Sequence, residues 1–168
     1  MAAALEPRWT DACALADVVA ASQGYRGLHV VRGEPPVALS VFRSRDGRLF
    51  CVETPCPHAG HRLSNGHALD PGDVEDLVTE KAGLGVLVSC PAHSYVYDTR
   101  SGECVSAFGG GPGRAVVHPT RLVGDVVQVD LVPSPAATEA LAGLDTETRN
   151  AIGMRCVEQA LAIKFGDT

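Results

Sequence analysis

The sequence has few aromatic residues, no long hydrophobic run and no excess of positive charge. Only 5% of its 168 residues are aromatic, whereas 18 Gly and 11 Pro indicate short elements and tight turns. Since no stretch of 18 uncharged apolar residues occurs, we expect no contact with a membrane interior. The formal charge of −6 argues against nucleic acid and anionic membranes as partners. The length predicts one main domain, and we expect a monomer.

A secretory signal is also missing. Residues 1–5 contain no basic side chain, and Glu6, Arg8 and Asp11 interrupt the apolar stretch at the start of the chain. We therefore expect a cytoplasmic protein. In that compartment six Cys and six His indicate metal binding or catalysis before disulfides.

Short β segments separated by turn signals dominate the middle of the chain. The predicted strands span residues 28–31, 37–42, 49–53, 86–89, 95–98, 116–121 and 126–131. Hairpin turns are predicted at 45–47, 100–102 and 123–125. The fold is therefore expected to be mainly antiparallel β.

The pattern changes to a helical one after residue 135. Residues 138–144 and 145–165 contain no Pro, and Ile152, Cys156 and Ala160 recur every fourth residue. This pattern predicts one or two C-terminal helices packed on the β body. Asp145 is the expected N-cap and Gly166 the expected C-terminal stop.

Two similar motifs combine Cys with His: Cys56-Pro57-His58 and Cys90-Pro91-Ala92-His93. Each motif follows an apolar predicted strand, so each loop would present one thiolate and one imidazole at a strand end. Two thiolates and two imidazoles complete either one tetrahedral zinc or two irons bridged by sulfide. Zinc modules usually draw the Cys pair and the His pair from separate knuckles. The mixed loops fit a 2Fe-2S cluster, with both Cys on one iron and both His on the other.

These motifs resemble the two cluster loops of the Rieske family, which read Cys-x-His and Cys-x-x-His. Residues 97–103 resemble the strand and hairpin after the second loop, and residues 9–17 resemble the opening of Rieske ferredoxins. The resemblance implies Rieske-like antiparallel sheets with cluster-binding loops. It also implies a Rieske-type 2Fe-2S cluster held by Cys56, His58, Cys90 and His93, with the second nitrogen of each imidazole facing solvent.

The same resemblance points to three residues beside the cluster. Tyr97 matches a position that donates a hydrogen bond to a cluster Cys. Pro112 belongs to residues 108–113, which either cover the cluster as a third loop or only connect to the last hairpin. His61 either lies at the cluster edge or is an ordinary exposed loop residue.

Three features depart from the family pattern. The interval of 31 residues between His58 and Cys90 is long, and indicates an insertion at about 65–85, expected as a surface excursion. His61 and Ala92 stand where respiratory members have disulfide-forming Cys, which excludes that disulfide. Ser94 follows His93 where ferredoxins usually have Gly. We expect a reduction potential of about −150 to 0 mV, at the low end of the Rieske range.

The remaining Cys and His residues are expected to have structural roles. Cys13, Cys51, Cys104 and Cys156 fall within apolar patterns and are predicted to be small core residues. His29, His67 and His118 are predicted to be structural or solvated. The acidic residues 70, 73, 75 and 76 form either a solvated face or a docking site for a partner.

The resemblance implies a Rieske domain at residues 9–132 and a helical extension at 133–168. The resulting hypothesis is a soluble one-electron carrier between a reductase and an acceptor such as an oxygenase. It would not be an enzyme itself, because 168 residues leave no room for a second, mononuclear iron domain. The alternatives are a small Rieske-like subunit of a nitrite reductase-type complex and a zinc-stabilised, non-redox binding module.

Overall fold

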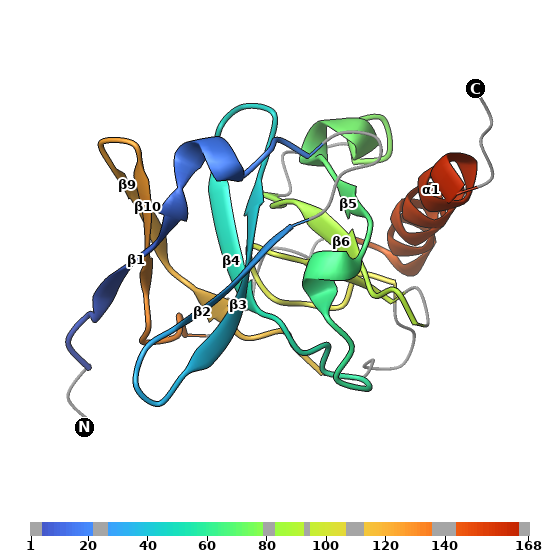
Figure 1. The fold of residues 1–168 in the computed structure, drawn as a ribbon. Coiled ribbons are helices and arrows are strands. Elements are labelled where there is room, and N and C mark those ends of the chain that lie inside the picture. Colours follow the sequence, from blue (N-terminus) through green and yellow to red (C-terminus); the bar gives the residue numbers. More distant parts are fainter. Residues whose placement is uncertain are drawn as a thin grey trace.

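The computed structural model describes residues 5–21, 27–78, 83–92, 95–106, 113–135 and 144–164. In these residues short strands form three antiparallel sheets, and one long helix follows them (Figure 1). The strands are β1 (Trp9–Ala14), β2 (Leu28–Arg32), β3 (Val37–Arg43), β4 (Leu49–Glu53), β5 (Ala68–Leu69), β6 (Leu87–Ser89), β7 (Val96–Asp98), β8 (Val117–His118), β9 (Thr120–Val123) and β10 (Val126–Asp130). The helix is α1 (Thr146–Lys164). The predicted fold, mainly β with a C-terminal helical extension, is confirmed.

Two sheets pack around a shared apolar core. One has the order β1-β10-β9 and the other β2-β3-β4-β8. Strand β1 was not predicted, because its partner β10 lies more than a hundred residues away, with Trp9 opposite Asp130. Leu39 and Val41 of β3 meet Val127 and Val129 of β10 in this core.

The predicted strand at 116–121 is wrong, because it is two strands in two different sheets. β8 pairs with β4, whereas β9 pairs with β10. Pro119 separates them, and a proline has no N–H to donate to a sheet. Its carbonyl accepts instead from the Asp130 N–H at 2.9 Å. The chain therefore changes sheets at this residue.

The third sheet, β5-β6-β7, has two buried faces. Ala68, Val88 and Tyr97 contribute to one core, and the adjacent residues Leu69, Leu87 and Val96 contribute to another. Successive side chains of a strand point to opposite faces, so the sheet separates these two cores. We call the first the inner face and the second the outer face.

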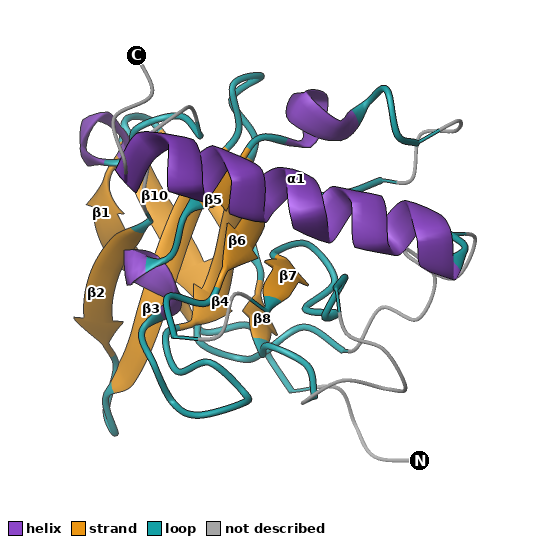
Figure 2. Ribbon diagram, turned by 90° about the vertical axis from the view of Figure 1, so that its right-hand side faces the viewer, coloured by secondary structure: helices purple, strands orange, loops and turns teal. Residues whose placement is uncertain are grey.

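Helix α1 covers the outer face (Figure 2). Its buried residues Ile152 and Cys156, predicted from their spacing, pack in the same core as Leu69 and Leu87. Asp145 is the predicted N-cap, and its carboxylate accepts from the Thr148 N–H at 2.7 Å. Most of the possible first helix at 138–144 lies outside the described residues, as does Gly166.

The insertion at about 65–85 is not only a surface excursion. The short helix η3 (Pro71–Val74) follows β5, and Leu69, Val74 and Leu84 are buried in the core under α1. Asp70 is also buried, and accepts from the Arg45 backbone N–H at 2.7 Å. The expectation of a solvated acidic face therefore holds for Glu75 and Asp76, which are exposed, and is wrong for Asp70. None of the described helices is long and apolar enough to cross a membrane.

Candidate metal centre

The first predicted loop is a closed turn that follows β4. Pro55 and Arg62 form an isolated β-bridge at its base, and the Cys56 N–H donates to the His61 carbonyl at 2.8 Å. The Gly60 N–H donates back to the Cys56 carbonyl at 2.9 Å, and Gly60 has a positive φ of 76°. This geometry buries the Cys56 side chain and leaves His58 exposed at the loop tip.

The second predicted loop connects β6 to β7. The Cys90 N–H donates to the Tyr95 carbonyl at 2.7 Å, which closes the loop one residue beyond each strand. Cys90 is buried, whereas Pro91 and Ala92 are exposed. His93, the fourth expected ligand, lies outside the described residues.

The two loops meet on the inner face of the β5-β6-β7 sheet. Cys56 and Cys90 belong to the same buried core, together with Tyr97. The Tyr97 hydroxyl lies 3.4 Å from Cys56 Sγ. At the surface, the His58 ring lies 4.9 Å, centroid to centroid, from the ring of Tyr95. The first loop therefore contacts Tyr97 in the buried core through Cys56, and contacts Tyr95 nearer the surface through His58.

Burial keeps the Tyr97 hydroxyl protonated. Desolvation is the largest cause that raises the pKa of Tyr97 far above its usual range, followed by the hydrogen bond with Cys56. A protonated phenol beside a thiolate donates its hydrogen to the sulfur. The Tyr97 hydroxyl therefore acts as the donor toward Cys56 Sγ when Cys56 is a thiolate.

His61 and Pro112 are the other two residues expected beside the cluster. His61 is exposed, and its carbonyl holds Cys56. Pro112 lies outside the described residues. The next residue, Gly113, comes so close to the first loop that an added Cβ would lie 3.7 Å from Pro57 Cβ. The chain therefore passes beside the first loop immediately after the predicted third loop.

The remaining Cys and His residues have structural positions. The six Cys, all described, form no disulfide, and Cys51, Cys104 and Cys156 are buried while Cys13 is half-buried. The buried His118 lies 2.9 Å from Glu53 Oε2 through Nε2 and 2.9 Å from the Asp130 carbonyl through Nδ1. Sequence alone could not find these partners, because they are distant along the chain.

The donor set fits a metal centre with a buried thiolate side and an exposed imidazole side. Cys56 and Cys90 supply two sulfurs within one core, and His58 supplies an imidazole at the surface. Within the described ranges no group of three or more His, Cys, Asp or Glu is placed to hold a single metal ion. A centre of two irons needs only two protein ligands on each iron, and the expected His93 is the fourth.

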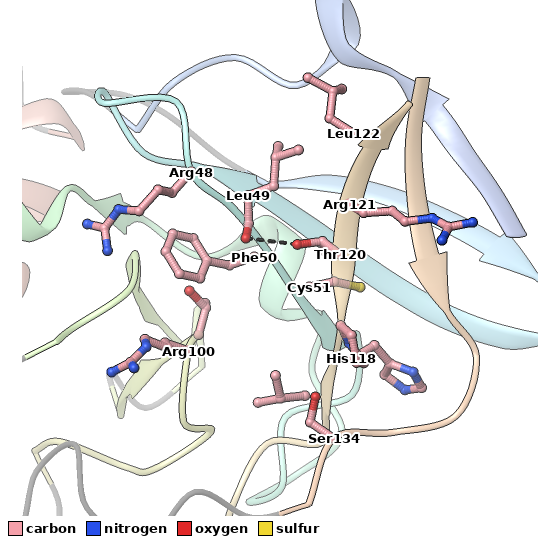
Figure 3. Close-up of a pocket in the computed structure, with 13 residues that line it drawn as sticks. Arg48, Leu49, Phe50, Cys51, Arg100, His118, Thr120, Arg121, Leu122 and Ser134 are labelled. Atoms are coloured by element: carbon pink, nitrogen blue, oxygen red, sulfur yellow. Dashed lines mark hydrogen bonds between the residues drawn. The ribbon is translucent and has the colours of Figure 1, made fainter. Parts of the chain in front are cut away.

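A pocket of about 460 Å³ lies at the opposite end of β4 from Cys56. Arg48 and Arg100 lie on either side of Phe50 there, whereas Arg121 points away from them (Figure 3). Arg48 pairs with Asp46 at 2.9 Å, and Arg121 donates to Gln128 at 2.8 Å. None of the candidate ligands in the described residues lines this pocket, so it is separate from the metal centre.

The antiparallel sheets and the two Cys-His loops define the class of this protein. It is a β domain in which two adjacent loops are suited to hold an iron-sulfur centre. The family model of the Rieske [2Fe-2S] domain matches residues 8–112, which include both Cys and His motifs. The chain belongs to this family, and its cofactor is a Rieske-type 2Fe-2S cluster.

Solved structures share this fold. A protein from Mycobacterium tuberculosis described as a small subunit of NADH-dependent nitrite reductase is 23% identical, with a TM-score of 0.59, 76% of this chain covered and 97% of that one. The ferredoxin of Sphingomonas yanoikuyae B1 is 19% identical, with a TM-score of 0.54 and coverages of 74% and 100%. A chain from the complex of reduced oxygenase and oxidised ferredoxin in carbazole 1,9a-dioxygenase is 21% identical, with a TM-score of 0.55 and coverages of 76% and 96%.

About a quarter of this chain has no counterpart in these nearly fully covered structures. Helix α1 lies beyond the residues that the family model matches. No curated protein matches the sequence.

Proposed function

We propose that the protein is a one-electron carrier of the Rieske ferredoxin type, with its cluster held by Cys56, His58, Cys90 and His93. The observation that carries this proposal is the meeting of Cys56 and Cys90 in one buried core, with the Tyr97 hydroxyl on Cys56 Sγ. When bound, the cluster supplies the redox chemistry by taking up and releasing one electron.

The buried Cys side and the exposed His side of the site have different roles. The two buried Cys keep water away from the sulfur side. Tyr97 donates a hydrogen bond that favours added negative charge on the sulfur, which raises the reduction potential. The exposed His58 brings an imidazole edge to the surface, where a partner can come within electron-transfer distance. This arrangement supports electron transfer through contact with another protein.

We propose redox proteins as partners: a reductase as donor, and an oxygenase or similar protein as acceptor. The structural similarity to the chain from the oxygenase and ferredoxin complex supports this choice. A small subunit of a nitrite reductase-type complex is the second candidate, supported by the similarity to the Mycobacterium protein. The proposal includes a monomer in the cytoplasm, with a cluster domain at 9–132 and an extension at 133–168. The protein itself would have no catalytic activity.

Metal analysis tests the proposed site. The purified chain should contain two irons and two acid-labile sulfides, and reduction should give a rhombic EPR signal of low average g. Cys56→Ala and Cys90→Ala should each lose the iron and the signal, because each removes one of the two thiolates. The matched control is Cys51→Ala, which changes an equally buried Cys in the core between the first two sheets.

The control should keep its iron and its signal. One zinc per chain without sulfide would instead support the zinc-stabilised binding module. Iron retained at wild-type levels in Cys90→Ala would show that the ligands lie elsewhere.

A further inference from the structure

The residues after β7 extend the β5-β6-β7 sheet at its edge. The Asp98 N–H donates to the Glu103 carbonyl at 2.9 Å, and the Val105 N–H donates to the Val96 carbonyl at 2.7 Å. Tyr97 and Cys104 form the bridge between these two bonds. The backbone at 103–105 therefore fixes the strand from which Tyr97 reaches Cys56.

This edge segment has residues on both faces of the sheet. Cys104 belongs to the inner core with Cys56, Cys90 and Tyr97. Val105 belongs to the outer core under α1. A movement of α1 that displaces this segment would therefore also displace Cys104 on the inner face, where the candidate ligands lie.

Arg149 of α1 holds the segment directly. Its Nη2 donates to the Cys104 carbonyl at 2.7 Å, and its Nε donates to the Val105 carbonyl at 3.1 Å. A guanidinium has several donors in a rigid plane, so one side chain can fix two consecutive carbonyls. An ammonium is a single point charge and cannot reproduce this geometry.

One helical turn further along, α1 approaches the same segment without an intervening side chain. A Cβ added to Gly153 would lie 2.8 Å from Ser106 Cβ, closer than real side chains come. The Ser106 hydroxyl oxygen accepts from the Val96 N–H at 2.9 Å. Thus Arg149 and Gly153 both place α1 against the edge segment that pairs with β7.

We propose that Arg149 is a positioning residue for the metal centre. By holding the carbonyls of Cys104 and Val105, it keeps the edge segment paired with Tyr97, and thereby keeps the Tyr97 hydroxyl on Cys56 Sγ. The proposal rests on the proposed function and assigns the C-terminal helix a role in setting the reduction potential.

A second arginine of α1 supplies the control. Arg155 donates to the Asp73 carbonyl at 2.8 Å and to both carboxylate oxygens of Asp76 at 2.9 Å. It carries the same charge on the same helix, but it contacts the insertion and not the edge segment. Arg155→Met therefore removes an equivalent cation and an equivalent anchor of α1 without loosening the strand beside Tyr97.

The test is a set of holoprotein variants compared by potentiometric titration followed by EPR. Tyr97→Phe removes the hydroxyl and should lower the potential. Arg149→Met should lower it in the same direction, and should have no further effect in the Tyr97→Phe background. Arg149→Lys, which keeps the charge and is the milder change if the Met variant folds poorly, should also lower it. Arg155→Met should leave it unchanged.

Three results would overturn the inference. The potential of Arg149→Met and Arg149→Lys could equal that of the wild type. The effect of Arg149→Met could persist fully in the Tyr97→Phe background, which would indicate a simple loss of charge. Arg155→Met could lower the potential as much. In all three results the wild type still carries its cluster and the proposed function stands, whereas a wild-type chain without iron and sulfide would refute that function itself.

Discussion

Charged side chains in this acidic protein form pairs between elements that are distant in the sequence. Arg155 of α1 binds Asp76 of the insertion through two hydrogen bonds of 2.9 Å. Arg45, beside the β3–β4 turn, pairs with Asp70 and Asp73. Such pairs tie the insertion to the rest of the chain, although their exposed members contribute little individually.

The pair between Arg155 and Asp76 predicts a pH-dependent contribution to stability. Hydrogen bonds from Arg155, and then its charge, hold the pKa of Asp76 below its ordinary value. A carboxylate with a lowered native pKa stabilises the folded state above its unfolded pKa of about 3.9, and this contribution is lost as the pH falls through the native pKa. Asp76→Asn should therefore be less stable than the wild type at pH 7, and the difference should shrink below about pH 4.

Urea unfolding at pH values from 7 to 3 measures this difference. In the Arg155→Met background, Asp76→Asn should have a much smaller effect at every pH, since its partner is missing. A difference between wild type and Asp76→Asn that stays constant down to pH 3 would contradict the prediction.

At the residue scale, the sequence predicted side chains whose chemistry is local and missed those whose partners are distant. Cys56 and Cys90 could be selected because their motifs are short and specific, whereas Tyr97 was selected only because it matches a position of the family. The burial of Asp70 could not be predicted, because it depends on the backbone N–H of Arg45. A pattern along the chain holds no information about a hydrogen bond formed between separate elements.

Helix α1 lies beyond residues 8–112, which the family model matches. Ile152 is completely buried between α1 and the β5-β6-β7 sheet, whereas Met154, two residues later, is 55% exposed. Ile152→Ala should lower the free energy of unfolding by about 2–5 kcal/mol, because it removes apolar contacts and leaves a cavity.

The matched control is Met154→Ala, which should change the free energy of unfolding by less than about 0.5 kcal/mol. Chemical denaturation of both variants measures the two values. Equal losses in the two variants would mean that α1 does not dock on the sheet through the face that contains Ile152.

At the scale of elements, prediction succeeded where one local signal dominates. The helix was predicted because Asp145 caps it and its buried residues recur every fourth position. The insertion was described less well, since residues such as Leu69 and Val74 are buried only by packing under α1. The strand predicted at 116–121 failed because its β-branched residues were given more weight than Pro119, which divides the run between two sheets.

The described residues form three apolar cores, and the two candidate Cys ligands belong to only one of them. Cys56 and Cys90 lie in the core of the inner face. The core between the first two sheets and the core under α1 contain neither residue. Loss of the cluster should therefore destabilise one region more than the others, because the metal stabilises the residues that hold it.

Hydrogen exchange of cluster-loaded and cluster-free protein measures this difference. Amides of β6 and β7 and of the two loops should lose protection when the cluster is removed. Amides of β10, such as Val127 and Val129, should keep most of theirs, since they belong to the core of the first two sheets. A uniform loss of protection across all strands would show that the three cores unfold as one unit.

Helix α1 covers the outer face of the β5-β6-β7 sheet, and it is synthesised after the strands of that sheet. Leu69, Leu87 and Val96 leave the ribosome well before residues 146–164, which bury them. During that interval the nascent sheet has its loop-bearing side but lacks its apolar cover, a condition in which partly folded chains aggregate. Assembly of the iron centre on a complete chain, with α1 already docked, would take place on a sheet whose outer face is covered.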